Sequence, residues 1–495
     1  MHHKPKHTQH DTPTHRHAGE SDTDGTAAAR WLLPVLLVAQ LMVILDITAV
    51  NIALPHIASD LNLSGSAISW AITSYTLIFG SLLLFGGRAA DLLGRRRMFL
   101  TGLGVFTAFS FASAMAGSAE MLFASRAGQG LGAAMLSPAA LSIVTSTFHG
   151  PARGKAFAAW GAVGGAGAAI GVLIGGVLTQ FTDWRTIFYV NLPVAAVLLV
   201  ASVRVIPADT QTPRWRGLDL TGAVLATTSL ATIVYGITQA NSAGWTSIQT
   251  HVCGIGGLVG LAAFATYEMH IEAPLLRVDR IAERAIGGGL ILMLATAGSI
   301  FGLFLLCSLY LQNVLGMAPL ATGLAFIPLA LSAGIGAHGA GHVIAKHGVR
   351  GPLAGSFAVA AVGMLLLSRV GEHSSYLTGV LPGMLIAGVA LGVATVSVST
   401  AILTGTRQEE SGMISGLNST GHEIGGTLGI AIFSTIAAGA TGAIVGPQAA
   451  GGIGHAFLIA AVLATLASLV ALAILPRAEH FLARLQLNPQ AMPAH

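Results

Sequence analysis

The sequence predicts an all-α polytopic membrane protein, and three observations lead to that fold class. First, 53% of the 495 residues are hydrophobic and a further 63 are glycine. Second, charged residues make up only 9% of the chain, compared with roughly 25% in a soluble globular domain. Third, apolar stretches of about 20 residues, long enough to cross a bilayer as helices, recur along the chain. The net charge of +4 reflects basic loops, so nucleic acid is not an expected partner.

The first 30 residues are polar, contain six histidines and lack the apolar core of a signal peptide. We expect a disordered cytoplasmic tail, with metal sensing by the histidines as the alternative. The apolar stretches that follow predict fourteen membrane-spanning helices. They lie near residues 31–55, 67–87, 98–118, 120–146, 156–178, 186–206, 219–239, 249–269, 287–310, 319–341, 353–371, 377–404, 413–438 and 454–475.

The basic residues indicate the orientation of these helices. All but three of the 24 lysines and arginines lie on the same side as the N-terminus. The exceptions are Arg126, which lies inside a span, and Arg185 and Arg369, which lie on the other side. Basic residues concentrate in cytoplasmic loops. We therefore expect both termini in the cytoplasm, in a bacterial plasma (inner) membrane.

Two landmarks recur at a fixed offset of 254 residues, which predicts an internal duplication. The loop from Gly87 to Gly94 returns as the loop from Gly341 to Gly348. A glycine at every fourth position also recurs, as Gly167, Gly171 and Gly175 and again as Gly421, Gly425 and Gly429. We expect two six-helix bundles facing the same way, with two linker helices between them. The predicted parts are a tail (1–30), the first bundle (31–206), the linker (207–284), the second bundle (285–476) and a C-terminal tail (477–495).

The glycine stripes have two interpretations. Glycines four residues apart let a neighbouring helix approach closely, which is a packing role. Because the stripe recurs in the same helix of both halves, it is also a candidate for a surface that moves during transport. Cys253 and Cys307 lie in apolar runs, and we interpret both as packing residues.

Charged residues inside spans are costly and therefore informative. Asp46 and Arg126 are predicted at similar depth in the first and fourth spans, where they can neutralise each other or face a shared cavity. The duplication keeps neither charge, because Ile300 and Val380 stand 254 residues further on. Either the pair fixes helix packing, or protonation of Asp46 releases Arg126.

Glu423 is the other carboxylate that lies clearly inside a span, next to His422 and beside the second glycine stripe. It is a candidate second protonation or cation-binding site. The alternative is that it reaches solvent, because the cytoplasmic loop is only one or two turns away.

The motifs resemble the major facilitator superfamily and, within it, the fourteen-helix drug:proton antiporters. The most specific match is the end of the first helix, from Leu45-Asp46 to Leu54-Pro55. The resemblance implies that Asp46 is the proton-linked carboxylate. Arg126, with the Gln129-Gly130 that follows it, matches a signature whose arginine is implicated in proton transfer.

The loop between the second and third helices resembles the superfamily signature that latches the two halves on the cytoplasmic side. The residues that carry this gating role by resemblance are Gly87, Asp91, Gly94, Arg95 and Arg96. The sequence departs from the antiporter pattern in two places. Val172 stands where a proline normally follows Gly171, and His422-Glu423 replaces the more usual Arg-Gln type of pair.

The predicted function is proton-coupled export of drug-like small molecules by alternating access, with the proton gradient as the energy source and no cofactor or metal. The chain is expected to act as a monomer in the lipid bilayer. Alternatives with the same fold are a dedicated exporter of one endogenous metabolite and a proton symporter. A membrane enzyme or sensor is not expected, because no nucleophile or metal-ligand cluster is evident. Candidates for substrate contact, equally suited to packing, are Trp70, Tyr75, Met135, Phe301 and Phe304.

Overall fold

The computed structural model describes most of the chain between residue 22 and residue 481. The described ranges are 22–63, 67–148, 150–209, 212–215, 217–272, 274–281, 283–403, 411–439, 449–478 and 481. Most of the two predicted tails, including the six N-terminal histidines, lies outside the described residues.

Six long helices make up the N-terminal half: α1 (Asp22–Asp60), α2 (Ala67–Leu93), α3 (Arg95–Ala114), α4 (Ala119–Thr147), α5 (Gly150–Phe181) and α6 (Thr186–Val205). Local signals set the boundaries between them. Gly94 separates α2 from α3 with a φ of 110°, a conformation that suits glycine. Ser118 caps α4 by accepting a hydrogen bond from the Met121 amide at 3.2 Å.

Two helices follow as an antiparallel pair, α7 (Leu220–Ala243) and α8 (Ile248–Glu268). Each begins behind a capping side chain: Asp219 accepts from the Gly222 amide, and Ser247 accepts from the Thr250 amide. The short helix α9 (Val278–Ile281) leads into the C-terminal half.

The C-terminal half repeats the long helices with more interruptions. Its elements are α10 (Arg284–Leu309), η1 (Tyr310–Val314), α11 (Pro319–Ala325), α12 (Ile327–His347), α13 (Arg350–Leu367), η2 (Tyr376–Val380), α14 (Leu381–Leu403), α15 (Ser411–Gly439) and α16 (Ala449–Ile474). The elements η1 and η2 are single π-helical turns that continue α10 and lead into α14.

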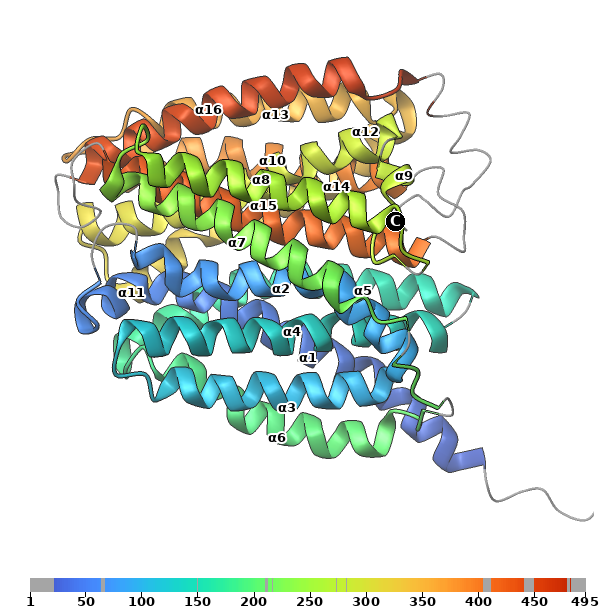
Figure 1. Cartoon of the computed structure of the whole chain (residues 1–495). Coiled ribbons are helices and arrows are strands. Elements are labelled where there is room, and N and C mark those ends of the chain that lie inside the picture. Colours follow the sequence, from blue (N-terminus) through green and yellow to red (C-terminus); the bar gives the residue numbers. More distant parts are fainter. Residues whose placement is uncertain are drawn as a thin grey trace, which may run out of the picture.

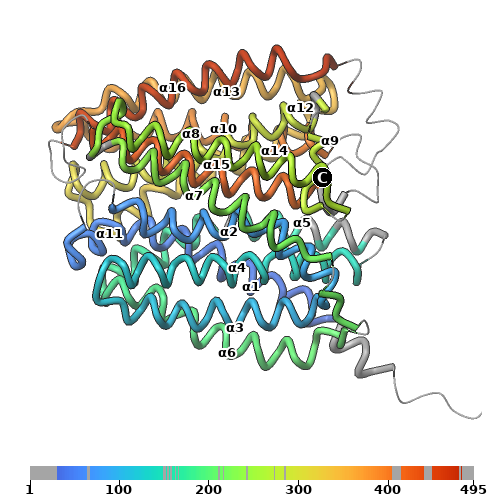
Figure 2. Tube along the Cα trace, viewed as in Figure 1, coloured from blue at the N-terminus to red at the C-terminus, as the bar shows by residue number. Residues whose placement is uncertain are grey.

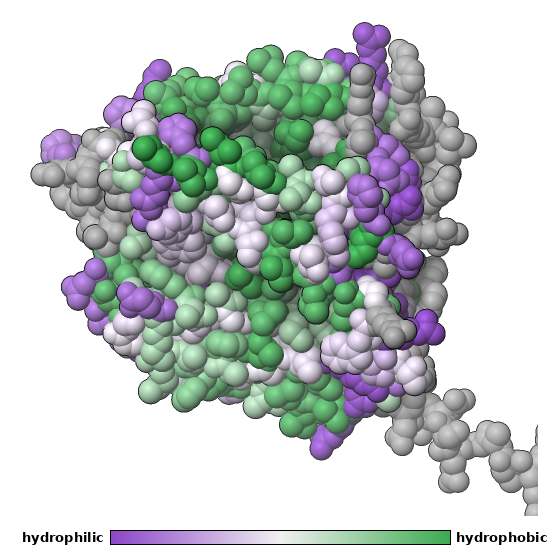
Figure 3. All heavy atoms as spheres, in the orientation of Figure 1, coloured by the Kyte–Doolittle hydropathy of each residue, from purple (hydrophilic) through white to green (hydrophobic). Residues whose placement is uncertain are grey.

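Twelve helices in the described part of the chain are long and apolar enough to cross a membrane. The fourteen predicted spans each coincide with a helix, but α5 and α15 are not among the twelve. In α5 the apolar part is the shorter stretch Gly167–Phe181, and α15 carries His422 and Glu423 in its middle. Hydrophobic residues cover the middle of the surface, and hydrophilic residues gather at its two ends (Figure 3).

The two halves pack their helices in the same pattern. In the N-terminal half α1 packs on α5, and α4 lies against α2 and α3. In the C-terminal half α10 packs on α15, and α14 lies against α12 and α13. These pairings are what a duplicated unit produces, and Figure 1 shows the two groups of helices side by side.

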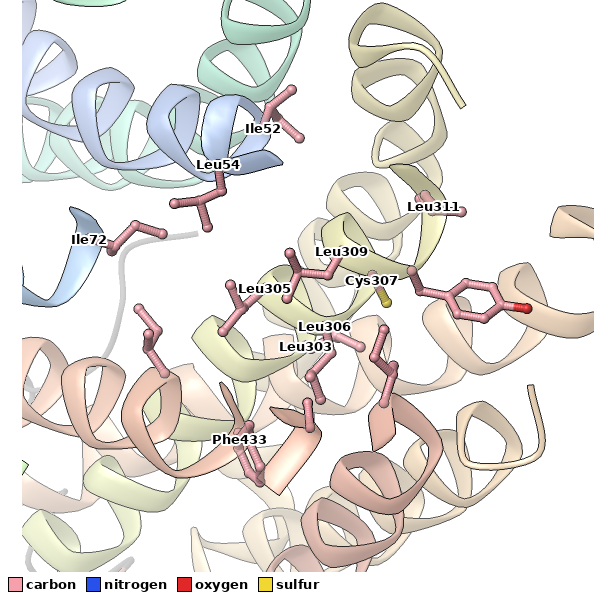
Figure 4. Close-up of a cluster of buried hydrophobic side chains, with 14 of the residues drawn as sticks. Ile52, Leu54, Ile72, Leu303, Leu305, Leu306, Cys307, Leu309, Leu311 and Phe433 are labelled. Atoms are coloured by element: carbon pink, nitrogen blue, oxygen red, sulfur yellow. The ribbon is translucent and has the colours of Figure 1, made fainter. Parts of the chain in front are cut away.

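The buried side chains form three main hydrophobic cores. We call the end of the bundle at which α1 begins and α16 finishes the near face, and the other end the far face (Figure 1). Two cores are each confined to one half in their buried members, 32–206 for the first and 286–481 for the second. The third core, toward the far face, is shared by both halves. It joins Ile52 and Leu54 of α1 to Leu305 and Leu309 of α10 (Figure 4).

Polar contacts close the seam between the halves toward the far face. Ser308 donates to the Asn51 carbonyl at 3.2 Å, and Gln312 donates to the Ile52 carbonyl at 3.0 Å. The Leu320 amide donates to Gln180 at 3.1 Å, joining α11 to α5.

Helix α7 of the linker pair lies along the seam between the halves. It contacts both α2 and α15. Leu230 and Val234 of α7 form a small buried cluster with Leu77 of α2 and Ala431 of α15. Helix α8 packs on α7 and exposes most of its apolar side chains. The trace in Figure 2 shows α7 beside α15, with α8 next to α7.

Candidate functional site

The structure brings Asp46 and Arg126 into direct contact at the centre of the N-terminal half. Arg126 Nη1 donates to Asp46 Oδ2, and the two residues are 0% and 1% exposed respectively. The predicted similar depth of the two charges is therefore confirmed. A fully buried charge pair is rarely retained for stability alone, since two well-packed apolar residues often stabilise a core as well.

Amide side chains surround the other carboxylate oxygen. Gln129, one turn after Arg126 on α4, donates to Asp46 Oδ1 at 3.1 Å, and Asn191 of α6 donates to the same oxygen at 3.1 Å. Both amide nitrogens also lie within hydrogen-bond distance of Ser110 Oγ of α3, at 2.7 and 3.3 Å. The carboxylate thus accepts three hydrogen bonds, from side chains of α4 and α6.

Two groups of α2 also contact the Arg126 guanidinium. Its Nε donates to the Ala71 carbonyl at 3.0 Å, and its planar group lies 4.4 Å from the centre of the Tyr75 ring. The Nη2 atom is buried and has no hydrogen-bond partner among the described residues. When Asp46 gains a proton, Arg126 loses its charged partner, so a proton on this carboxylate changes contacts on four helices.

At the described positions related by the duplication offset, the C-terminal half has apolar residues instead of this polar centre. Ile300 lies partly buried against the shared core, and Val380 is 1% exposed within it. These are the positions at the duplication offset from Asp46 and Arg126. The buried ion pair therefore belongs to one half alone.

Glu423 lies where α15 crosses α2, between the halves. A side chain on Gly80 of α2 would begin 2.8 Å from Glu423 Cβ, so glycine permits the close crossing. Four residues further along α15, Thr427 donates to Thr76 Oγ1 of α2 at 2.8 Å. Glu423 Oε2 is buried and has no hydrogen-bond partner among the described residues, so this oxygen does not reach solvent.

His422 faces a different neighbour. Its ring meets the edge of Phe301 of α10, with 5.6 Å between ring centres. Phe301 packs against both the shared core and the core of the N-terminal half. Phe301 of α10 thus reaches the core of the other half.

The other four substrate candidates have different surroundings. Tyr75 is completely buried under Arg126, and Phe304 is stacked on Phe326 at 4.9 Å. Trp70 packs in the small cluster beneath α7, and Met135 packs against the core of the N-terminal half. A substrate role for all five residues stays a prediction.

The glycine stripes face inward within each half. A Cβ on Gly175 would lie 2.6 Å from Ala49 Cα of α1, and Gly167 and Gly171 face the same helix. In the C-terminal half, Gly425 approaches Leu294 Cα of α10 in the same way, at 2.7 Å. These contacts set the spacing of α1–α5 and α10–α15. Gly176, next to the first stripe, meets the other half instead, 2.7 Å from the Pro319 carbonyl by the same measure. A role of the stripes in conformational change stays a prediction.

The loop between α2 and α3 is held by the segment that follows α6. Asp209, after α6, accepts hydrogen bonds from the Arg96 amide at 3.1 Å and the Arg97 amide at 3.0 Å, and so caps α3. Arg96 Nη2 also donates to the Val203 carbonyl at 2.6 Å. The space beside Gly94 is filled by the Asp209 carboxylate.

Of the predicted latch residues, Asp91 is exposed, while Gly87, Gly94, Arg95 and Arg96 are partly buried. Asp91 pairs with Arg95 one turn later at 3.4 Å, and Ser142 of α4 lies 3.5 Å from the same carboxylate oxygen. Gly87 faces Pro138 of α4, 3.7 Å from the position of a Cβ. All of these contacts lie within the N-terminal half. A latch between the halves stays a prediction.

Sequence reasoning missed three residues of this region: Ser110, Asn191 and Asp209. The first two are polar residues inside apolar spans, a signal that was available but weaker than a charge. Asp209 could not be identified from the sequence, because acidic residues are common in loops. The helix that it caps also begins more than a hundred residues earlier in the chain.

Among the described residues, no group of three or more histidine, cysteine or acidic side chains is placed to hold a metal ion. Cys307 is buried and Cys253 is half-buried, and both are free thiols.

Comparison with known proteins agrees with the motifs. Residues 36–430 match the family model described as Major Facilitator Superfamily. The puromycin resistance protein pur8 of Streptomyces alboniger is 40% identical over 420 residues, covering 83% of this chain and 82% of that protein. The cephamycin export protein CmcT of Amycolatopsis lactamdurans is 34% identical over 423 residues, covering 85% and 87%.

Solved structures share the fold at low sequence identity. A bacterial homologue of the human lysosomal transporter Spinster, in an inward-facing and unoccupied conformation, has a TM-score of 0.62 and 17% identity. The match covers 94% of this chain and 99% of that one. With the matched model spanning most of the helices and the relatives covering over four fifths of the chain, the protein belongs to the Major Facilitator Superfamily.

Proposed function

We propose that this protein is a proton-coupled exporter of drug-like small molecules that works by alternating access. The observation that carries the proposal is the buried Asp46–Arg126 pair, which is held by side chains of α4 and α6 and has no counterpart in the other half. A carboxylate in a membrane protein interior is a natural carrier of a coupled proton. The names of the relatives, which include resistance and export proteins, support the direction of transport.

In this mechanism the chain spans the membrane fourteen times, with the near face in the cytoplasm. The far-face core joins the two halves, whereas the near-face cores are separate. This arrangement fits a state in which the transport path is closed toward the outside of the cell. Substrate enters from the cytoplasm or inner leaflet while Asp46 is charged. After outward release, a proton on Asp46 weakens its bond to Arg126 and favours the return. Proton and substrate favour different states, so each shifts the population against the other.

The proton gradient supplies sufficient free energy for this cycle. One proton moving through about 100 mV releases about 2.3 kcal/mol, and one pH unit adds about 1.4 kcal/mol. Together these sustain a gradient of a neutral substrate of several hundred-fold.

The test is accumulation in everted membrane vesicles with an imposed proton gradient, using puromycin, lincomycin and a cephamycin as probes. We expect at least one probe to accumulate, and we expect Asp46→Asn to reduce its gradient from several hundred-fold to about one. Asp279→Asn, which removes an exposed carboxylate near α9, is the matched control and should accumulate the probe normally. Uptake of the probe into intact cells with the same proton dependence would contradict export.

A dedicated exporter of one endogenous metabolite is the second candidate. It is favoured by the names of two relatives, the cephamycin export protein and a probable actinorhodin transporter of Streptomyces coelicolor. A growth-inhibition panel on cells with and without the protein separates the two. Protection against several unrelated compounds supports a multidrug exporter, and protection against one chemical class supports a dedicated exporter.

A further inference from the structure

The linker helix pair contains two buried carboxyl groups that the transport mechanism does not use. Asp219 immediately precedes α7 and Glu268 is the last residue of α8, so the antiparallel pairing places them together at one end of the linker. Each residue is 3% exposed. Burial of two acidic side chains in one place is costly unless their charges are compensated.

One oxygen of each carboxyl group already has a donor. Asp219 Oδ1 accepts from the Gly222 amide at 2.8 Å, which caps α7. Glu268 Oε2 accepts from the Leu276 amide at 3.1 Å, which fastens the chain that follows α8. These two bonds fix the orientation of both carboxyl groups.

The other two oxygens lie beside the same glycine of α7. Asp219 Oδ2 and Glu268 Oε1 are buried and have no donor among the described residues. Both lie beside Gly222, where Glu268 Oε1 is 2.6 Å from the position of a Cβ and Asp219 Oδ2 is nearer still. The two side chains are within hydrogen-bond reach of each other. Two carboxylate oxygens are both acceptors, so this bond forms only when one of them carries a proton.

The charged groups nearby have other partners. On the side of α8, Arg277 pairs with Asp279 at 3.0 Å, and Arg280 contacts Glu283. The His270 ring nitrogen lies 2.7 Å from the Thr266 carbonyl. Glu268 itself contacts the Asp219 carboxyl group and the backbone at positions 275 and 276.

The structure also describes the surroundings of the charged residues of α2 and of the segment before α7. At the near-face end of α2, Asp91 pairs with Arg95, and Arg88 is half-buried. Arg214 donates through its backbone amide to the Leu92 carbonyl at 2.9 Å. On α15, which also packs on α7, Glu423 lies against Gly80. The contacts named above for these groups are made to residues other than Asp219 and Glu268.

We propose that Asp219 and Glu268 form a second proton-binding site, separate from Asp46, in which one shared proton joins the start of α7 to the end of α8. Two facing carboxylates cannot both ionise without strong repulsion. Removing the shared proton therefore drives the ends of the two helices apart and loosens the bonds to Gly222 and Leu276. Because α7 also contacts α2 and α15, the site links the protonation of the linker to the seam between the halves.

The variant Glu268→Gln tests this site directly. Its amide oxygen can still accept from Leu276, while its NH₂ group donates to Asp219 without any proton from solvent. Asp219→Asn is the reciprocal variant, and it keeps a good helix cap. Asp279→Asn is the control, because it removes a nearby exposed carboxylate that is not part of the pair.

The readout is the thermal unfolding temperature of the purified full chain in detergent across a pH series. An isolated carboxyl group loses its proton near pH 4.3, whereas the folded pair keeps one, so the stability that this proton supplies is lost as the pH rises. We expect the wild-type Tm to fall by about 1–2 °C per pH unit from this site. In Glu268→Gln and Asp219→Asn this step should be absent, and in Asp279→Asn it should be retained.

An infrared difference spectrum between acidic and alkaline buffer gives an independent readout. The C=O band of a protonated carboxyl group should be present in the wild type and reduced in both amide variants. Equal pH dependence of Tm in the wild type and both amide variants, or an unchanged infrared band, would overturn the proposal. So would a rise in wild-type Tm on adding Ca²⁺ at alkaline pH that Glu268→Gln lacks, because the pair would then hold a metal ion.

Discussion

In the N-terminal half, α1 packs on α5 and carries Asp46 into a network with Arg126, Gln129 and Asn191. In the C-terminal half, α10 packs on α15 in the same way, but Ile300 takes the place of Asp46. The ionisable group of that half lies instead on α15, where Glu423 faces α2 across the seam. The two halves share the same helix packing but carry their buried ionisable residues on different helices.

This division suggests different tasks for the two carboxyl groups. Asp46 is enclosed within one bundle, so its proton acts by changing contacts among the helices of that bundle. Glu423 Oε2 is buried at the seam without a described partner, so it is placed to respond to whatever enters between the halves. Variants of the two sites test this contrast between Asp46 and Glu423.

Breaking the buried pair from one side should be the most damaging change. Arg126→Leu leaves Asp46 buried without its positive partner, and we expect a loss of about 3–5 kcal/mol in the free energy of unfolding. Adding Asp46→Asn to that variant should recover much of the loss, because no charge is then left unpaired. Thermal unfolding of the single and double variants measures the coupling. Additive effects of the two substitutions would show that the pair is not a unit.

Removing one amide from the network should cost less. Asn191→Ala deletes a hydrogen bond to the Asp46 carboxylate at 3.1 Å, worth about 1.5–3 kcal/mol for a charged acceptor. The matched change in the other half is Asn418→Ala, whose amide donates to Ser399 at 3.4 Å. We expect Asn191→Ala to lower Tm and proton-driven accumulation more than Asn418→Ala does. The reverse order would remove the distinction between the halves.

The smallest and most selective effect is expected at the seam. Glu423→Gln removes a negative charge but keeps the size of the side chain. Accumulation of cationic substrates should fall by several-fold, since about 1 kcal/mol of charge attraction is lost, while neutral substrates should be unaffected. Vesicle assays with a matched cationic and neutral pair of compounds measure the ratio. Equal losses for both would assign Glu423 to proton coupling instead of substrate charge.

The positions of the helices and of the buried charges could be predicted from the sequence, because both depend on simple patterns: runs of apolar residues and rare charges within them. Apolar runs located every long helix, and the scarcity of charge inside spans identified Asp46, Arg126 and Glu423. Helix rise alone placed the first two at similar depth, and the structure then showed that they touch.

Other features depend on which surfaces meet, and helix periodicity does not determine that. The stripe containing Gly171 faces α1 inside its own half, while the adjacent Gly176 meets α11 of the other half. A shift of one residue turns a helix position by about 100°, so only the packed structure separates the two roles. The Asp209 cap on α3 and the Asp219–Glu268 pair likewise arise from segments that the chain brings together from a distance.

In the proposed mechanism, Asp46 couples the proton to substrate movement without being needed for the movement itself. Purified wild-type protein and Asp46→Asn, each in lipid vesicles, separate these functions with any compound that the vesicle panel identifies. We expect Asp46→Asn still to exchange labelled for unlabelled substrate when no proton gradient is present, yet no longer to accumulate substrate when a gradient is imposed. Accumulation by Asp46→Asn at the wild-type level would show that Asp46 is not the coupling residue.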